Sequence, residues 1–475
     1  MHMHIGGKDM LPEADRWLAV LNPATGGEID RVPDGTPGEV NQAVAAAEEA
    51  FGPWSSRTAR ERGMVLYRAA GLVRERLQEL ARGLTMEQGK PLRDATDEVR
   101  GFANILEFYA GASAGMQGEF ISLGGAGDAV VVHEPIGVCG AIIPWNMPAI
   151  IMGWKVAPAL LCGNTMVYKP ASQAPLTSLR LTAILEEAGL PPGALNVVTG
   201  RGEVVGEAIV RHPGIQKISF TGDVETGQRV QALAAGSRKE ITLELGGSDP
   251  MIVWKDANLE KAVAGAIRGR FYNAGQTCTA VKRLYVHQAI GKEFIARLKA
   301  QVQGMAVGDG LLPGVEMGPL SGAPQLDRIT RIMAEVKAHG EGGIFTGGSP
   351  VPGPGYGPGF FFPPTLVTDP LPESVLLREE VFGPVLPVMC IPDLETAISH
   401  ANETRYGLGA SVWTRDLLVA REVFSRVRAG IVWVNRHLTV PPEIPFGGLK
   451  SSGNGRENGL QALQAYTRTR TLFLG

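Results

Sequence analysis

The stretch from residue 137 to residue 244 alternates short apolar segments with amphipathic helical patterns, and this alternation constrains the fold most. Strand patterns occupy residues 138–143, 165–169, 196–198, 217–220 and 242–244, with helical patterns between them, as at 175–188 and 203–211. Elements in this order build a parallel sheet with helices on both faces. The alternation resumes near Pro250. We therefore predict an α/β fold with two doubly wound parallel-sheet domains.

Two shorter segments do not belong to this alternation. Residues 119–134 read as a hairpin around a Gly-rich turn, and residues 466–474 alternate Thr and Arg as an edge strand does. An exposed strand edge is a liability unless it is paired. We expect residues 116–135 and 462–475 to form a small β element that pairs with another copy of the chain. The two α/β domains are expected at 1–115 with 136–246, and at 247–445.

Composition excludes several classes of protein. Lys and Arg total 45 against 48 Asp and Glu, a net charge of −3, which argues against a nucleic-acid partner. Four cysteines lie far apart without a CxxC pair, so we expect no disulfide framework, no metal site and a reducing, cytoplasmic location. No apolar leader segment is evident at residues 1–8. Residues 141–161 are nearly uncharged but contain Pro144, Pro148 and Pro158, which predicts buried core and no membrane span.

Cys278 is the candidate nucleophile. It stands between Thr277 and Thr279, three residues after Gly275, so no bulky neighbour shields the sulfur. A lone cysteine is more often a buried, inert residue, but the small polar neighbours weaken that alternative. A cysteine nucleophile needs a lowered thiol pKa, a base and donors for an oxyanion.

Two stretches supply the missing groups. Asn146 follows a predicted strand, where its amide would donate to an oxyanion; the alternative is an Asn that caps the next helix. Glu244 ends a strand ahead of Gly246 and Gly247, and a carboxylate in apolar surroundings is a base near neutral pH. The alternative is a capping or salt-bridged glutamate.

Two other stretches are suited to an anionic ligand. Residues 217–227 run from a strand through a tight Gly turn into a helix, whose first N–H groups face any anion there. Lys169 ends the strand at 165–169, and nucleotides bind at the carboxyl ends of strands in open α/β sheets.

Together these stretches resemble the NAD(P)-dependent aldehyde dehydrogenase superfamily. Seven blocks occur in the family order, at residues 144–148, 169–172, 220–227, 244–247, 275–278, 380–384 and 445–448. Such an ordered set is far more specific than any single motif. The resemblance implies the family's fold, with the first domain binding NADP or NAD and the second carrying the nucleophile. It also implies assembly of the chain into a homodimer or homotetramer.

The resemblance also implies roles for individual residues. Cys278 matches the nucleophile, Asn146 the oxyanion hole and Glu244 the base that releases the acid from a thioester. The cofactor-binding positions are Trp145, Lys169, Ser172, Phe220, Thr221, Gly222, Gly227, Leu245, Glu380 and Phe382. The aldehyde-binding positions are Met147, Trp154, Tyr272, Thr277, Thr279, Val440 and Phe446.

Two residues depart from the family pattern at positions that affect cofactor binding. Ser172 stands where NAD-restricted members commonly carry Glu, which predicts that NADP⁺ is used, although the nearby Glu203 opposes this. Asp223 stands where a small hydroxyl residue is usual and adds negative charge near a pyrophosphate.

The substrate expectation rests on two aromatic positions. Trp154 and Tyr272 stand where semialdehyde-oxidising members commonly carry Arg, which predicts a neutral aliphatic, aromatic or small hydroxy-aldehyde of the lactaldehyde, glycolaldehyde or glyceraldehyde type. Arg436 and His437 are counter-evidence, because either would hold an anion if it lay at the tunnel mouth. The alternatives are a succinic semialdehyde type of enzyme and a catalytically silent structural member of the fold. Transfer of the acyl group to coenzyme A is disfavoured by Glu244.

Overall fold

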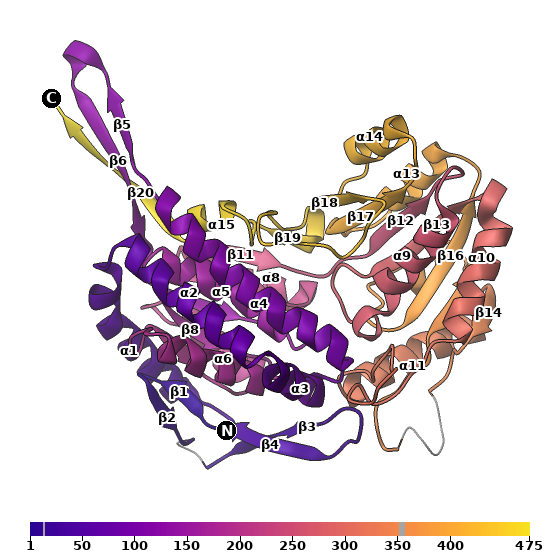
Figure 1. Cartoon of the computed structure of the whole chain (residues 1–475), viewed down its shortest axis with the longest axis horizontal. Coiled ribbons are helices and arrows are strands. Elements are labelled where there is room, and N and C mark those ends of the chain that lie inside the picture. Colours follow the sequence, from indigo (N-terminus) through magenta and orange to yellow (C-terminus); the bar gives the residue numbers. More distant parts are fainter. Residues whose placement is uncertain (13–14, 351–356) are drawn as a thin grey trace.

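Two open sheets dominate the computed structural model, which describes residues 1–12, 15–350 and 357–475 (Figure 1). The first sheet has the strand order β19-β11-β10-β7-β8-β9-β1-β2, with its five inner strands parallel and β19, β1 and β2 antiparallel. The strands are β1 (Met3–Ile5), β2 (Lys8–Met10), β7 (Val138–Ile142), β8 (Thr165–Lys169), β9 (Leu195–Val197), β10 (Lys217–Thr221), β11 (Glu240–Glu244) and β19 (Gly453–Asn454).

Helices cover both faces of this sheet, because its side chains alternate between two cores. Cys139 and Ala141 of β7 pack with helices α2 to α6, while Val138 and Ile142 pack with α1, α7 and α8. These helices are α1 (Pro37–Ser55), α2 (Ala59–Glu75), α3 (Leu77–Gln88), α4 (Leu92–Ala112), α5 (Pro148–Leu161), α6 (Leu176–Glu187), α7 (Glu207–Arg211) and α8 (Val224–Ala235).

The first sheet reverses its winding between β7 and β10. From β7 the chain builds outward through β8 and β9, then returns to place β10 and β11 on the other side of β7. Ligands bind at such a switch point, outside the carboxyl ends of the strands. The loop after β7 carries Asn146 and the loop after β10 carries Gly222, so both lie at this position.

The second sheet has the order β14-β15-β16-β13-β12-β17-β18 and is parallel except for β14. Met251 and Val253 pack with α9 to α11, and Ile252 packs with α13 and α14 on the other face. The strands are β12 (Asp249–Val253), β13 (Val281–His287), β14 (Gly343–Thr346), β15 (Thr365–Thr368), β16 (Val385–Ile391), β17 (Gly409–Trp413) and β18 (Ile431–Val434). The helices are α9 (Leu259–Phe271), α10 (Gln288–Gln303), α11 (Ala323–Ala338), α12 (Val375–Arg378), α13 (Leu394–Asn402) and α14 (Leu417–Arg426). The prediction of an α/β fold with two doubly wound sheets is confirmed.

A three-stranded arm extends from the first sheet (Figure 1). Its strands are β5 (Glu119–Ser122), β6 (Asp128–Pro135) and β20 (Thr467–Leu474), in the order β20-β6-β5, and the short helix α15 (Gln461–Gln464) precedes β20. The predicted hairpin and edge strand thus pair with each other, all antiparallel. Apolar side chains stay exposed on it, with Phe120 at 66% and Phe473 at 57%.

Some elements differ from the sequence-based expectation. The strands β1 and β2 were not expected; they extend the first sheet, and a separate antiparallel hairpin is formed by β3 (Trp17–Leu21) and β4 (Glu28–Pro33). The pattern at 203–211 is a π-helical turn (Gly202–Gly206) before α7, not one helix. The pairing of β19 with β11 brings residues 453–454 to the first sheet, and the domain boundaries stay a prediction. None of the helices in the described residues is long and apolar enough to cross a membrane.

Candidate active site

Two cavities meet at the sulfur-bearing residue Cys278. A cleft of about 790 Å³ runs along the carboxyl ends of the first sheet, and a smaller cavity of about 140 Å³ lies on the other side of Cys278. Cys278, Asn146 and Ile151 line both cavities. A molecule in the large cleft and a second molecule in the small cavity would therefore meet at this cysteine.

The large cleft collects most of the predicted cofactor residues. Gly227 does not line it; this glycine allows α8 to pack against Leu245, because a Cβ there would collide with the Leu245 side chain. The predicted residues that do line the cleft are Trp145, Lys169, Ser172, Phe220, Thr221, Gly222, Leu245, Glu380 and Phe382.

The small cavity collects every predicted aldehyde-binding residue. Trp154 packs on Phe446 with ring centroids 5.0 Å apart. Arg268, which sequence reasoning missed, also lines this cavity and lies over the Tyr272 ring at 5.5 Å from its centroid. The predicted residues that line it are Met147, Trp154, Tyr272, Thr277, Thr279, Val440 and Phe446.

Neither Arg436 nor His437 lines the small cavity. Arg436 is exposed, and His437 is buried with both ring nitrogens in hydrogen bonds. Burial lowers the pKa of His437 to about 4, so the ring is neutral; its Nε2–H donates to the Thr279 carbonyl (2.7 Å) and its Nδ1 accepts from the Ser411 hydroxyl (2.9 Å). His437 therefore supports the loop of the nucleophile and is no anion clamp.

The loop around Cys278 is held by its carbonyl groups. The Gln276 carbonyl accepts from the Asn146 side chain at 3.0 Å and from the Asn273 side chain at 3.2 Å. The Cys278 N–H has no hydrogen-bond partner within the described residues. Gly275, at φ +75°, closes this loop, and a Cβ on it would collide with the Gly383 carbonyl oxygen. With its carbonyls directed to donors in the protein, the loop leaves the Cys278 N–H free for a developing oxyanion.

The thiol of Cys278 is not ionised in this structure at neutral pH. Burial raises its pKa to about 12, Lys282 opposes this, and the carboxylates of Glu380, Asp249 and Glu244 reinforce it. A thiolate, not a thiol, is the nucleophile. The site therefore needs a base, or a ligand that changes these charges, before Cys278 reacts.

Glu244 has the environment of such a base. Its side chain is buried, and neither carboxylate oxygen has a hydrogen-bond partner in the described part of the chain. Burial raises its pKa well above the ordinary range, Glu457 raises it further, and Lys155 and Arg456 oppose them. Glu244 lines neither cavity, and a Cβ on Gly447 would lie 2.8 Å from its Oε1. The carboxylate therefore lies outside both cavities in this structure.

A buried ion pair beside Glu244 was missed from the sequence. Lys155 of α5 pairs with Glu457, and the Ser219 hydroxyl donates to Glu457 at 2.6 Å and accepts from Lys155 at 3.0 Å. The three residues come from distant parts of the chain. Their charges set the field around Glu244, since Glu457 is the largest electrostatic cause of its raised pKa after burial.

A second buried ion pair supports Asn146. Lys90 pairs with Glu98 and donates to the Asn146 carbonyl at 2.8 Å, while Glu98 accepts from the Ala149 N–H at 2.8 Å. The Asn273 side chain donates to the same Asn146 carbonyl at 3.0 Å. The backbone of this turn is thereby fixed, and the Asn146 amide is held at the point where the two cavities meet.

The large cleft fits a nicotinamide dinucleotide. Its volume lies in the range of ligand-binding cavities. Lys169 ends β8 in the cleft, and burial lowers its pKa to about 8, which leaves a donor for ribose or phosphate oxygens. The Asp223 carboxylate is occupied by its own helix, accepting from the Thr226 N–H at 2.8 Å and hydroxyl at 2.7 Å. The carboxylate is therefore held by hydrogen bonds that do not involve a ligand.

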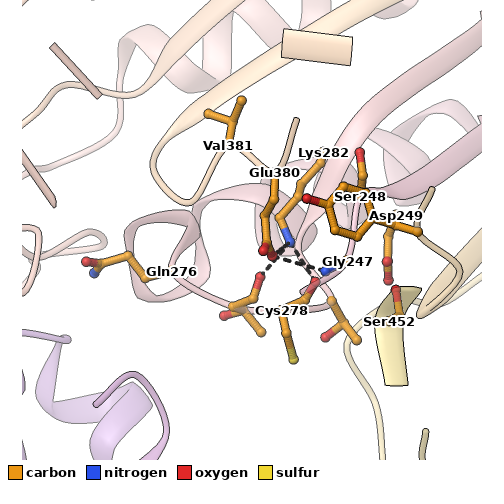
Figure 2. A network of polar contacts seen from close by, with 12 residues as sticks. Gly247, Ser248, Asp249, Gln276, Cys278, Lys282, Glu380, Val381 and Ser452 are labelled. Carbon is orange, nitrogen blue, oxygen red and sulfur yellow. Dashed lines mark hydrogen bonds and ion pairs between the residues drawn. The ribbon is translucent and has the colours of Figure 1, made fainter. Parts of the chain in front are cut away.

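Glu380 belongs to a buried network behind the cleft (Figure 2). Its Oε1 accepts from the Gly247 N–H at 3.1 Å and pairs with Lys282 at 2.8 Å. A Cβ on Gly246 would collide with the same carboxylate, so any other residue there would displace the Glu380 side chain. Gln325 and Arg328 of α11, also missed from the sequence, line the cleft near Glu380. Among the site residues that were not predicted, a sequence signal exists only where a charged residue interrupts an apolar strand, as Lys282 does in β13.

Comparisons with known proteins agree with this geometry. The sequence model of the aldehyde dehydrogenase family matches residues 11–472. A betaine aldehyde dehydrogenase of Rhizobium etli (strain CIAT 652) is 42% identical over 458 residues, covering 96% of this chain and 93% of that protein. The solved structure of an NADP-dependent enzyme of E. coli is 36% identical with a TM-score of 0.97, covering 100% and 98% of the two chains. A betaine aldehyde dehydrogenase variant of Staphylococcus aureus, solved with NAD⁺, is 34% identical with a TM-score of 0.96, covering 99% and 96%.

These matches extend over nearly the whole sequence and share one fold with it. The seven sequence blocks, the two doubly wound sheets and the cysteine between two cavities all occur together in this chain. The chain therefore belongs to the aldehyde dehydrogenase family.

Proposed function

We propose that this enzyme oxidises a small aldehyde to its carboxylic acid with NADP⁺ or NAD⁺, through a thioester on Cys278. The observation that supports this most directly is the meeting of the two cavities at Cys278 and Asn146. We also propose that the enzyme works in the cytoplasm, since all four cysteines are free thiols.

In the proposed reaction the residues act one after another. The Cys278 sulfur adds to the aldehyde carbon, and the thiol proton leaves to a base. The Asn146 amide and the Cys278 N–H then hold the resulting oxyanion. NADP⁺ or NAD⁺ held in the large cleft, with Lys169 and Glu380 among its lining residues, would supply the hydride acceptor. Glu244 afterwards removes a proton from water, which attacks the thioester and restores the thiol.

We propose a neutral aldehyde as the substrate. The small cavity is lined mainly by Met147, Trp154, Tyr272, Val440 and Phe446, which suit an uncharged chain. The curated relatives are named for betaine aldehyde, a trimethylammonium cation. Here Arg268 already occupies the Tyr272 ring face, where a substrate cation would stack, and its charge repels such a cation. A semialdehyde with a carboxylate is the second candidate, which Arg268 favours.

A charge series of aldehydes tests the substrate and the activity together. We expect kcat/KM to be higher for butyraldehyde than for succinic semialdehyde or betaine aldehyde. Desolvating a carboxylate costs several kcal/mol, and Arg268, already stacked on the Tyr272 ring, offsets this cost only in part. Initial rates with NAD⁺ and with NADP⁺ provide the measurement. The variant to test beside the wild type is Arg268→Gln, in which kcat/KM for betaine aldehyde should rise relative to kcat/KM for butyraldehyde. A higher kcat/KM for succinic semialdehyde, lost in Arg268→Gln, would make the second candidate correct.

We propose that the cleft accepts NADP⁺. Ser172 lines it and its hydroxyl donates to the Gly200 carbonyl at 3.0 Å, with Lys169 and Arg201 in the same cleft. The positive charges of Lys169 and Arg201, and the lack of a carboxylate at residue 172, suit a 2′-phosphate, although Glu203 lines the cleft as well. Ser172→Glu should lower kcat/KM for NADP⁺ relative to NAD⁺ by about tenfold or more, because like charges repel. Equal ratios in Ser172→Glu and in the wild type would show that Ser172 does not set the preference.

We propose that the chain forms a homo-oligomer through the arm of β5, β6 and β20. Exposed apolar side chains on this arm are Phe120, Ile121, Leu123, Val132, Leu472, Phe473 and Leu474. A patch of this kind on one element is typical of an interface. Multi-angle light scattering should give a mass of two or four chains, and Phe120→Asp with Phe473→Asp should lower it. A monomer mass for the wild type would refute the proposal.

A further inference from the structure

Lys282 lies at the centre of the network behind Cys278. Its side chain is fully buried, and all three ammonium protons have acceptors. The Nζ donates to the Cys278 carbonyl at 2.6 Å, to the Thr277 carbonyl at 3.1 Å and to Glu380 Oε1 at 2.8 Å. Figure 2 shows this side chain reaching between Glu380 and the backbone of Cys278. A single charged group thus connects the loop of the nucleophile to a carboxylate of the cofactor cleft.

Lys282 also ties Glu380 to the segment that follows Glu244. Glu380 Oε1 accepts from the Gly247 N–H, three residues after Glu244, while Glu380 lines the cleft. The other carboxylate oxygen lies beside Gly246. The Lys282 ammonium is also 5.6 Å from the centroid of the Phe382 ring, which faces Trp145 edge-on. Movement of Lys282 would therefore disturb the cleft and the nucleophile together.

The charges around Cys278 make Lys282 its principal cation. The carboxylates that face this group are Glu380, Asp249 and Glu244, and all three raise the thiol pKa. Asp249 is itself partly neutralised, because burial raises its pKa to about 7. The neutral His437 adds no charge, and Lys155 is paired with Glu457. Lys282 is the group that opposes the carboxylates at Cys278.

We propose that Lys282 is a positioning residue that couples the two halves of the site: it fixes Glu380 for the cofactor and, through the same ammonium group, stabilises the Cys278 thiolate. The Cys278 side chain points away from the network in Figure 2, so Lys282 acts through the loop backbone and its charge, without touching substrate. This inference rests on the proposed function of Cys278 and Glu380, and it adds a residue that determines when the thiol ionises.

The test is alkylation of Cys278 by iodoacetamide without cofactor, followed by mass mapping across pH 7–9.5. Lys282→Met should move the profile of log rate against pH about one pH unit to the alkaline side, which is about a tenfold lower rate at fixed pH. The same variant should bind NADP⁺ more weakly in a calorimetric titration. Glu380→Gln should also bind NADP⁺ more weakly but should move the alkylation profile to the acid side, because Lys282 then loses its counter-charge.

Shifts of the alkylation profile in opposite directions in the two variants distinguish this role from a purely structural one. A merely loosened loop would speed alkylation at every pH in both variants and would overturn the proposal. An unchanged alkylation profile in Lys282→Met would also overturn the proposal, as would the lack of an acid shift in Glu380→Gln. The Glu380→Gln result decides the question if Lys282→Met does not fold. Lys217→Met is the matched control: Lys217 is also buried, bonded to the Thr242 hydroxyl at 2.8 Å, and its loss should leave the profile unchanged. Alkylation needs no turnover, so failure of the proposed reaction would be seen separately, as activity retained in Cys278→Ala.

Discussion

Replacing Cys278 with alanine is expected to lower kcat on the order of 10⁴-fold or more, because the covalent path is lost. Asn146, the cleft and the small cavity remain in the variant, so binding of NADP⁺ should survive. Initial rates with the best aldehyde of the charge series measure the effect. The melting temperature should stay close to that of the wild type, since the side chain is small and lies between two cavities.

Cys390→Ala is the matched control for this substitution. Cys390 is a free and exposed cysteine on β16, outside both cavities, and its removal should leave kcat unchanged. Near-native turnover in purified Cys278→Ala would show that the assignment of the nucleophile is wrong. Loss of activity in both cysteine variants would point to a general effect on folding.

Glu244→Gln is expected to separate the two halves of the reaction. The amide cannot accept the proton of the attacking water, so the thioester should accumulate after hydride transfer. Stopped-flow absorbance should show a rapid burst of reduced cofactor, equal to the active sites, followed by steady turnover lowered by about 10²-fold or more. The absence of any burst would instead place Glu244 before hydride transfer, as the base for the thiol.

The raised pKa of Glu244 gives this prediction a pH dependence. The carboxylate acts as a base only when ionised, and burial together with Glu457 raises its pKa above the ordinary range. Steady turnover of the wild type should therefore fall as pH falls through that raised pKa, while the burst is retained. Glu225→Gln, an exposed glutamate on α8, should leave this profile unchanged.

The fold was predictable where the residue pattern is local. Strand β8 was predicted at its observed bounds, because β-branched and aromatic residues (Thr165, Val167 and Tyr168) lie between the turn signals Gly163 and Pro170. Helix α1 begins with a capping box of Thr36 and Glu39, a start signal that lies within four consecutive residues. The strands β1 and β2 have only three residues each, and the pairing of β1 with β9 depends on contacts nearly 200 residues apart. Such pairing leaves little signal in the sequence.

The candidate site was predictable where one residue type does the chemistry. Cys278, Asn146 and the residues of both cavities were assigned from short blocks, and the structure brings them together apart from Gly227 and Glu244. Glu380 was assigned to the cofactor, but its pairing with Lys282 was not found, and neither was the ion pair of Lys155 and Glu457. These partners are 98 and 302 residues apart, so only the folded chain pairs them.

The central claim is a thioester on Cys278, and trapping it is the most direct measurement. Glu244→Gln would be mixed with butyraldehyde and NADP⁺, quenched in acid and digested with trypsin. The peptide of residues 271–282 contains Cys278 as its one cysteine. We predict that this peptide gains the mass of a butyryl group, and that the gain is absent without NADP⁺ and removed by hydroxylamine. An unmodified 271–282 peptide under turnover conditions, or a butyryl group on another residue, would contradict the account.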